Sequence, residues 1–293
     1  MKRACVFAHF DLHDEVDDHV IYYLKCLRAT VDDLLFVTVS QLGGGTVDQI
    51  SALGIRVIQR DNEGYDFCSY KTGIDQLNLD DYDELLLCND SVYGPFVDLG
   101  ELTERMRTGG ADFWGITENF EYARHLQSYY LCFTKKVLQS AEFCNFWSEL
   151  EALENKREII RRYEVGLSQR LLKQGFRAAA LVSFEQESKL RRVRSSWRQY
   201  LCTVRRRWLD REFYLDVFHI LFSGRQIAVN PTHMEWKSLL IDHHSPFVKI
   251  ELLRDNPKGM DDLDSISSVI SGFSDYPSAL ISAHLARVGR APE

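Results

Sequence analysis

The sequence predicts an α/β fold, in which a mostly parallel central sheet carries helices on both faces. Short apolar runs alternate along the chain with segments whose apolar residues recur at helical spacing, as in parallel sheets with crossover helices. The clearest run, in YDELLLCNDSVYGPF at 82–96, ends abruptly in Asn89, Asp90 and Ser91, as expected of a buried strand that reaches a polar loop. Ligands bind beyond the carboxyl ends of the strands in such sheets, so we expect the functional site at this edge.

The composition is that of a soluble globular protein. The chain has 293 residues, of which 45% are hydrophobic and 27% charged, enough for one large domain with a smaller appendage. No apolar run reaches the length of a membrane span, and a net charge of −8 argues against nucleic-acid binding. The seven cysteines lack metal-type spacing and the first residues lack a signal-peptide pattern. We therefore expect reduced thiols and a cytoplasmic location.

Six strands are predicted from short apolar runs. The first run, ACVFAHF, stands near the start of the chain, and later runs such as LLFVTV and YYLCFT share its β-branched and aromatic character. The predicted strands are 4–10, 34–39, 55–59, 84–88, 112–116 and 129–134.

Helices are expected between and after these strands. Asp14 is placed to cap the first helix, in which Val16, Val20 and Leu24 recur at helical spacing. The glycines at 43–45 match neither standard glycine-rich phosphate motif, so we interpret them as a loose turn. The predicted helices cover 15–28, 46–53, 67–77, a stretch from about 135, and 163–174, which Gly175 would end.

The character of the chain changes near residue 189. Residues 189–211, KLRRVRSSWRQYLCTVRRRWLDR, hold nine basic residues and one acidic residue, with aromatic and aliphatic residues interleaved. This stretch could lie on an anionic membrane surface, or it could be a solvated helix that packs its tryptophans on the domain. We expect a main α/β domain at 1–185 and a helical C-terminal region at 186–293 that contributes to the site.

Polar residues gather after the first and third predicted strands. His9, Phe10 and Asp11 are candidates for contacts with a nucleotide base, and the alternative is a capped, solvated helix start. The metal-type residues that follow, His13, Asp14, Asp17, Asp18 and His19, match no standard ligand spacing, so we expect no metal site there. After the third strand, RDNEGYDFCSYK at 60–71 offers cations for phosphate, a glycine for close ligand approach, and polar groups for ribose or base. These candidates are Arg60, Asn62, Gly64, Asp66 and Lys71, and the alternative is a charged loop that caps a helix.

The fourth predicted strand supplies candidates for a metal and diphosphate site. Asp90, between Asn89 and Ser91, is suited to hold a divalent cation such as Mg²⁺ or Mn²⁺ against a diphosphate. The triplet alone is a weak signal, because Asx-rich turns are common. Farther along, His233 could complete the metal site and Lys249 could hold phosphate, although a lone histidine is more often structural.

Six blocks of sequence stand out, in order along most of the chain up to residue 257. They are RDNEGYDFCSYKTGI (60–74), LLLCNDSVYGPF (85–96), DFWGITEN (112–119), HLQSYYLCFTKKVL (125–138), YEVGLSQRLLKQGF (163–176) and NPTHMEWKSLLIDHHSPFVKIELLRDNP (230–257). Together they resemble the rhamnan synthesis protein F family, which are cell-wall and lipopolysaccharide rhamnosyltransferases of the GT-A type. The resemblance implies a GT-A-like nucleotide-sugar-binding fold and donor binding after strands one, three and four.

The resemblance also implies a reaction, the transfer of L-rhamnose from dTDP-rhamnose to a lipid-linked O-antigen or rhamnan glycan. Residues 89–91 would be the counterpart of the Asp-x-Asp motif, with only Asp90 acidic, so metal dependence stays open. Glu164 lies where related inverting enzymes carry their acidic base. From spacing alone, Glu164 could equally be a first-turn residue that complements the helix dipole. The basic stretch would place the enzyme at the inner face of the membrane, where the acceptor is.

Two alternatives belong to other classes of function. A Rossmann-type oxidoreductase needs a glycine fingerprint after the first strand, where this chain has HFDLHDE. A non-catalytic nucleotide-sugar-binding or scaffold module of a polysaccharide assembly complex is compatible with the single acidic residue at 89–91.

Overall fold

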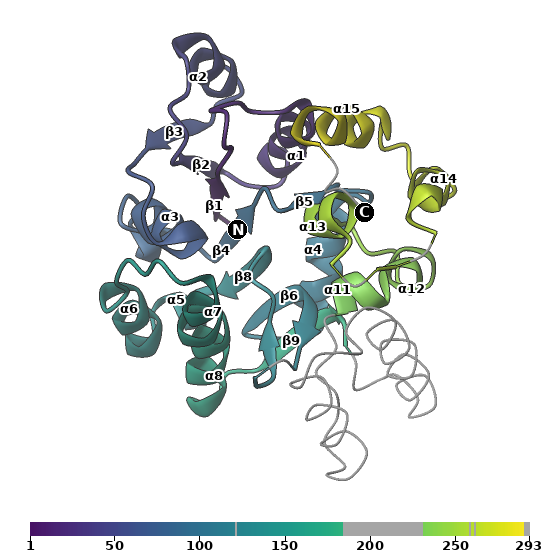
Figure 1. Ribbon diagram of the computed structural model, residues 1–293. Coiled ribbons are helices and arrows are strands. Elements are labelled where there is room, and N and C mark those ends of the chain that lie inside the picture. The colour runs from purple at the N-terminus through teal and green to yellow at the C-terminus, as the bar shows by residue number, and fades with distance from the viewer. Residues whose placement is uncertain (121, 184–230, 258, 261, 290–293) are drawn as a thin grey trace.

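The predicted α/β architecture is confirmed in the computed structural model of the chain. A mixed, mostly parallel sheet forms the centre, and helices pack on both of its faces (Figure 1). The structure describes residues 1–120, 122–183, 231–257, 259–260 and 262–289. The basic stretch 189–211 lies outside the described residues.

The main sheet runs in the order β3-β2-β1-β4-β8-β6-β7, and β9 also pairs with β6. The first four strands in this order, and the pair β6–β9, are parallel, whereas β8 is antiparallel to both of its neighbours. A separate antiparallel pair joins β5 to β10. The strands are β1 Arg3–His9, β2 Asp33–Thr38, β3 Arg56–Gln59, β4 Glu84–Asn89, β5 Val92–Tyr93, β6 Phe113–Asn119, β7 His125–Leu126, β8 Tyr130–Thr134, β9 Ala178–Val182 and β10 Val248–Lys249.

Alternation of side chains along the strands explains why both faces are covered. In β1, Ala4, Val6 and Ala8 enter one hydrophobic cluster, while Cys5 and Phe7 enter the cluster on the other face. Every residue of β4 is buried, as expected of a strand at the middle of a sheet that is packed on both sides.

The helices follow the predicted order with shifted boundaries. They are α1 Asp18–Arg28, α2 Gly44–Ser51, α3 Tyr65–Ile74, α4 Leu99–Thr108, α5 Lys135–Leu138, α6 Ala141–Ser148, α7 Lys156–Ile159 and α8 Val165–Lys173, with a 3-10 turn η1 at Leu79–Asp81 and a π-helical turn η2 at Ile160–Glu164. Helix α4 and the strands β5, β7, β9 and β10 were not predicted.

Several predicted helix starts are wrong. Helix α2 begins at Gly44, so the interpretation of 43–45 as a loose turn is wrong for Gly44 and Gly45, and α3 begins at Tyr65 rather than at 67. Helix α1 begins at Asp18 rather than at 15, and Asp14 does not cap it: Asp14 has a left-handed φ of 60°, and its carboxylate accepts a hydrogen bond from the Gln41 amide at 2.7 Å. The segment predicted as a helix start at 163 is the interior of a longer helical segment, which runs from Lys156 to Lys173 through η2.

The C-terminal residues pack against the end of the main sheet. Trp236, Leu240 and Ile270 share a third hydrophobic cluster with Tyr93 of β5 and with Phe96. Helix α15 lies beside α1 at the top of Figure 1. This region contains α11 Pro231–Met234, α12 Trp236–Ile241, α13 Ile250–Asp255, η4 Leu263–Ser265, α14 Ile266–Ser271 and α15 Ala279–Val288.

Two further observations concern the cysteines and the helices in the part of the chain that the structure describes. The six cysteines of this part are free thiols, as expected. Within the same residues, no helix combines the length and hydrophobicity that a bilayer crossing requires.

Candidate active site

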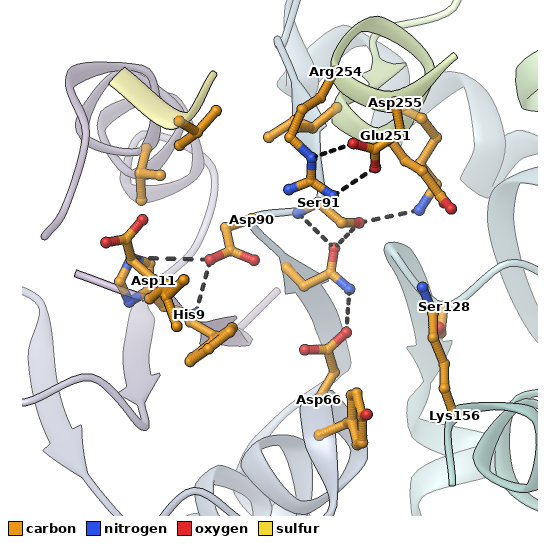
Figure 2. Close-up of a pocket in the computed structure, with 18 of the residues that line it drawn as sticks. His9, Asp11, Asp66, Asp90, Ser91, Ser128, Lys156, Glu251, Arg254 and Asp255 are labelled. Atoms are coloured by element: carbon orange, nitrogen blue, oxygen red, sulfur yellow. Dashed lines mark hydrogen bonds and ion pairs between the residues drawn. The ribbon is translucent and has the colours of Figure 1, made fainter. Parts of the chain in front are cut away.

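A cavity of about 770 Å³ opens at the carboxyl ends of β1 and β4 (Figure 2). Its walls come from the loop after β1, the first turn of α3, the end of β4, the turn η2, and helices α13 and α15. Ten of the predicted site residues line it, namely His9, Phe10, Asp11, Asp66, Asn89, Asp90, Ser91, Glu164, His233 and Lys249. The sheet topology explains this gathering, because parallel strands bring their carboxyl ends to one edge.

Asp90 contacts two residues at the end of β1 and directly after it. Its Oδ2 accepts a hydrogen bond from the Phe10 amide at 2.8 Å, and the Nε2 atom of His9 lies 3.9 Å from the same oxygen. Burial and the neighbouring Asp66 raise the pKa of Asp90 well above its usual range, against the effect of the Phe10 hydrogen bond. A cation at this position would favour the ionised carboxylate and reverse the shift, so Asp90 is suited to hold one.

Asn89 connects Asp90's neighbours into one chain of hydrogen bonds. Its amide nitrogen donates to Asp66 at 2.8 Å, and its amide oxygen accepts from the Ser91 hydroxyl at 2.6 Å. The Lys249 ammonium donates to the same hydroxyl at 3.0 Å, so β10 is linked to the end of β4. Burial raises the pKa of Asp66, and the charge of Lys249 acts in the opposite direction. Figure 2 shows Asp66 and Asp90 facing the same space.

His9, Phe10 and Asp11 form the side of the cavity that follows β1. The Nδ1 atom of buried His9 lies 2.9 Å from the Thr38 hydroxyl, and burial lowers the pKa of His9 to about 4, so the ring is neutral at pH 7. Phe10 is half exposed. Asp11 forms an ion pair with Arg287 of α15; burial raises its pKa, but the hydrogen bonds from Arg287 and from backbone amides outweigh this and lower it.

Glu164 reaches the cavity from the π-helical turn η2. Its Oε1 atom accepts a hydrogen bond from the Ser128 amide at 3.1 Å and lies 3.9 Å from the Nε2 atom of His125. The interpretation of Glu164 as a first-turn residue is therefore wrong, because a full helical turn precedes it. Turns of this kind insert one residue into a helix and are frequent at functional sites, since they redirect the side chains around them.

Four predicted residues do not line the cavity. Arg60 donates to backbone carbonyls of residues 61, 63 and 65, and Lys71 donates to the Trp147 carbonyl at 2.7 Å, so both cations hold the fold together. Asn62 is exposed in the loop. Gly64 has the predicted unusual backbone, with a φ of 63°, but a Cβ there would lie 2.1 Å from the Cys68 sulfur rather than against a ligand. These residues shape the loop that presents Asp66.

Other residues of the cavity also carry charge, and Lys156 and Asp255 among them were not predicted from the sequence. Lys156 starts α7 opposite Asp66, and Arg254 and Asp255 of α13 form an ion pair at 2.7 Å on the wall near Ser91 (Figure 2). Lys156 has no sequence signal, because a lysine at a helix start is common. His233 lies with its Nε2 atom 3.8 Å from Glu251, which also lines the cavity.

The cavity is rich in acidic groups. Among the described residues, seven carboxylates and three Lys or Arg side chains line it. The carboxylates belong to Asp11, Asp17, Asp66, Asp90, Glu164, Glu251 and Asp255, and the cations to Lys156, Lys249 and Arg254. A diphosphate placed here would add to the negative charge, and a divalent cation would relieve it.

Comparisons with known proteins agree with this arrangement at the level of family. The model of the family described as "Rhamnan synthesis protein F" matches residues 34–198. Virulence protein VirA of Vibrio anguillarum is 29% identical over 226 residues, which are 75% of this chain and 69% of that protein. Protein y4gN of Sinorhizobium fredii is 33% identical over 135 residues, 44% of this chain and 35% of that protein.

Solved structures resemble the chain only loosely. The glycosyltransferase GlyE of Streptococcus pneumoniae superposes with a TM-score of 0.37 at 11% identity, over 99% of this chain and 65% of that chain. A likeness at this level says nothing about substrates.

Proposed function

This chain belongs to the rhamnan synthesis protein F family and is a glycosyltransferase, and on that premise we propose that it moves L-rhamnose from dTDP-rhamnose to a lipid-linked cell-surface glycan. The observation that supports the proposal most directly is the position of the cavity. It lies beyond the carboxyl ends of parallel strands, and Asp66, Asp90 and Glu164 line it from three different elements.

The donor would bind along the edge of the sheet. We assign the nucleoside to Asp66 and to residues 9–11, and the diphosphate to the region of Asp90, Ser91 and Lys249. The Lys249 ammonium is partly buried and donates to Ser91, and it is the predicted cation that contacts this region. Stabilising the charge of the departing diphosphate should lower the barrier more than any other single effect.

A divalent cation fits the residues of this region. The excess of carboxylates over Lys and Arg side chains in the cavity supports this, because a divalent cation would offset their mutual repulsion. Asp90 would hold Mg²⁺ or Mn²⁺, with His233 as a second candidate ligand, and donor phosphate oxygens would complete the coordination. When bound, the cation would neutralise charge on the diphosphate.

Glu164 is our candidate for the base. In an inverting transfer, the carboxylate takes the proton of the acceptor hydroxyl while that oxygen attacks the anomeric carbon, and the bond from this carbon to the diphosphate breaks. The Ser128 amide would hold one carboxylate oxygen in a fixed orientation. Replacing Glu164 with Gln should lower the transfer rate about 100-fold or more and leave donor binding unchanged.

The matched control for Glu164→Gln is Glu158→Gln, an exposed glutamate on α7 that does not line the cavity. It should transfer at the wild-type rate. Full turnover by Glu164→Gln would remove the base assignment.

Calorimetric titration with dTDP, UDP and GDP, each with and without Mg²⁺, tests the donor. The proposal expects selective binding of dTDP that Mg²⁺ strengthens. Binding of donor without any transfer would favour the alternative, a nucleotide-sugar-binding scaffold module. If none of the three nucleotides bound, the assignments of Asp66 and Asp90 would be wrong.

We further propose that residues 189–211 attach the enzyme to the anionic inner face of the cytoplasmic membrane, where a lipid-linked acceptor is available. The nine basic residues of this stretch are the observation behind the proposal. Sedimentation with vesicles of anionic lipid, compared with neutral vesicles, tests it. Equal partitioning onto both would contradict the proposal.

A further inference from the structure

A cluster of three potential metal ligands lies on the wall of the cavity, apart from the end of β4. Asp17 precedes α1, His19 is in its first turn, and His284 is in α15. Each offers one ligand atom, and these atoms all lie within 4.8 Å of one another. Within the described ranges, no other group of three or more such residues is this close, and the cluster includes neither Asp90 nor His233.

The imidazole of His19 is buried without a hydrogen bond to any described residue. Its side chain is only 4% exposed, and neither ring nitrogen has a hydrogen-bond partner. An unsatisfied buried polar group costs about 1–3 kcal/mol, so the fold would not keep this imidazole without a use for it. Its ring centroid lies 4.5 Å from that of His284, and both residues line the cavity.

His284 is oriented for coordination by a second group. Its Nδ1 atom lies 2.6 Å from the hydroxyl of buried Tyr93, and its Nε2 atom faces Asp17, 3.6 Å from Oδ2. A hydrogen bond at one ring nitrogen fixes the tautomer and directs the other nitrogen toward a metal, as the outer partners of metal-bound histidines do.

Arg287 has to be considered because it is a cation next to the cluster. Its guanidinium pairs with both carboxylate oxygens of Asp17 and also with Asp11. Each carboxylate oxygen has a further lone pair, so Asp17 can keep Arg287 as an outer partner while it binds an ion. The positive charge of Arg287 lowers the affinity of the site without blocking it.

We propose that Asp17, His19 and His284 form a mononuclear site for a divalent transition-metal ion of the zinc class. Two imidazoles and one carboxylate suit such an ion better than Mg²⁺ or Ca²⁺, which prefer oxygen ligands. Ligands of a tetrahedral zinc site are about 3.4 Å apart, given bonds of about 2.0–2.1 Å. The ligand atoms, which lie within 4.8 Å of one another, therefore need to approach by at most about 1.4 Å. A fourth coordination position would face the cavity.

Metal binding at this site would fasten α15 to α1. The two helices are far apart in the sequence and together form one wall of the cavity. The ion would therefore stabilise this wall of the cavity. Its open coordination position could take an oxygen ligand there. The test of this metal site is independent of the identity of the donor, because it uses a metal ion alone.

The test uses the full chain with any polyhistidine tag removed and metals stripped by chelator. Titration with Zn²⁺ by calorimetry and with Co²⁺ by visible absorption should show one ion per chain, with a cobalt spectrum of low coordination number. Zn²⁺ should raise the melting temperature. His19→Gln and His284→Gln should each lower the affinity about 100-fold or more and lose this stabilisation.

Two control variants show whether the ion binds at these three residues. His13→Gln, an exposed histidine of the loop before α1, and Asp18→Asn, an exposed carboxylate in the first turn of α1, should both keep wild-type zinc binding. Circular dichroism shows whether each variant is folded, and the cobalt spectrum of the wild type does not depend on any variant. The absence of stoichiometric binding, or unchanged binding by His19→Gln, would overturn the proposal.

Discussion

Replacing Gly64 with Ala tests whether backbone conformation and close packing fix the loop that presents Asp66. Gly64 has a φ of 63°, and an added Cβ would lie 2.1 Å from the Cys68 sulfur and 3.1 Å from the Ala152 Cα atom. A left-handed conformation costs a non-glycine residue about 1–2 kcal/mol, and overpacking costs about 1–3 kcal/mol more. Gly64→Ala should therefore lower the free energy of unfolding by about 2–5 kcal/mol.

Urea unfolding followed by circular dichroism measures this change, and two further variants divide it into its parts. In Gly64→Ala/Cys68→Ala the sulfur is absent, so the double variant should recover the steric cost that comes from the sulfur and keep the conformational part. Gly44→Ala is the matched control: Gly44 is in α2 with open space around it, so Ala should leave stability unchanged or raise it by up to about 1 kcal/mol. A Gly64→Ala protein as stable as the wild type would refute the reasoning.

Three further predictions concern the site and its support. Lys249→Met should weaken nucleoside diphosphate binding at least about tenfold in calorimetry, because it removes the partly buried cation beside Ser91; unchanged affinity would contradict the assignment. Asn89→Ala should lower the free energy of unfolding by about 2 kcal/mol, because the hydrogen bonds to Asp66 and Ser91 are lost; a neutral effect in urea unfolding would contradict this. Asp112→Asn should cost about 1.5–3 kcal/mol at pH 7.

The effect of Asp112→Asn should depend on pH. The Asp112 carboxylate accepts hydrogen bonds from the Arg177 amide at 2.8 Å and from Lys136 at 3.0 Å. Burial raises the pKa of this carboxyl, but these partners outweigh burial and lower it. A lowered pKa contributes stability above the unfolded value of about 3.9, and this contribution is lost as the pH falls through the folded pKa. Unfolding curves of variant and wild type should therefore converge in acid, and a constant difference would contradict the assignment.

Local residue patterns were enough to predict the strands, because a buried strand is recognised from its own apolar residues. The six predicted strands have counterparts in the structure, and the end of β4 at Asn89 was placed within one residue. The helix starts were harder. Asp14 has the chemistry of a cap but turns the loop instead, and no local pattern marks the π-helical turn that carries Glu164.

Roles of single residues depended more on contacts from elsewhere in the chain. Arg60 and Lys71 have the right chemistry for phosphate, yet both bind backbone carbonyls, one in its own loop and one from α6. Lys156 looked unremarkable in the sequence and faces the cavity. The histidines at 19 and 284 are separated by most of the chain, so only the packing of α15 on α1 brings them together.

The sequence by itself determined the fold class, the six predicted strands, and the edge of the sheet at which the cavity lies. These follow from hydrophobic periodicity and from polar residues at strand ends, which are properties of neighbouring residues. Tertiary structure alone decided which polar side chains face the cavity and which make contacts that stabilise the fold. That choice depends on burial and on partners distant in sequence, because a buried polar group must find a hydrogen bond wherever the packing supplies one.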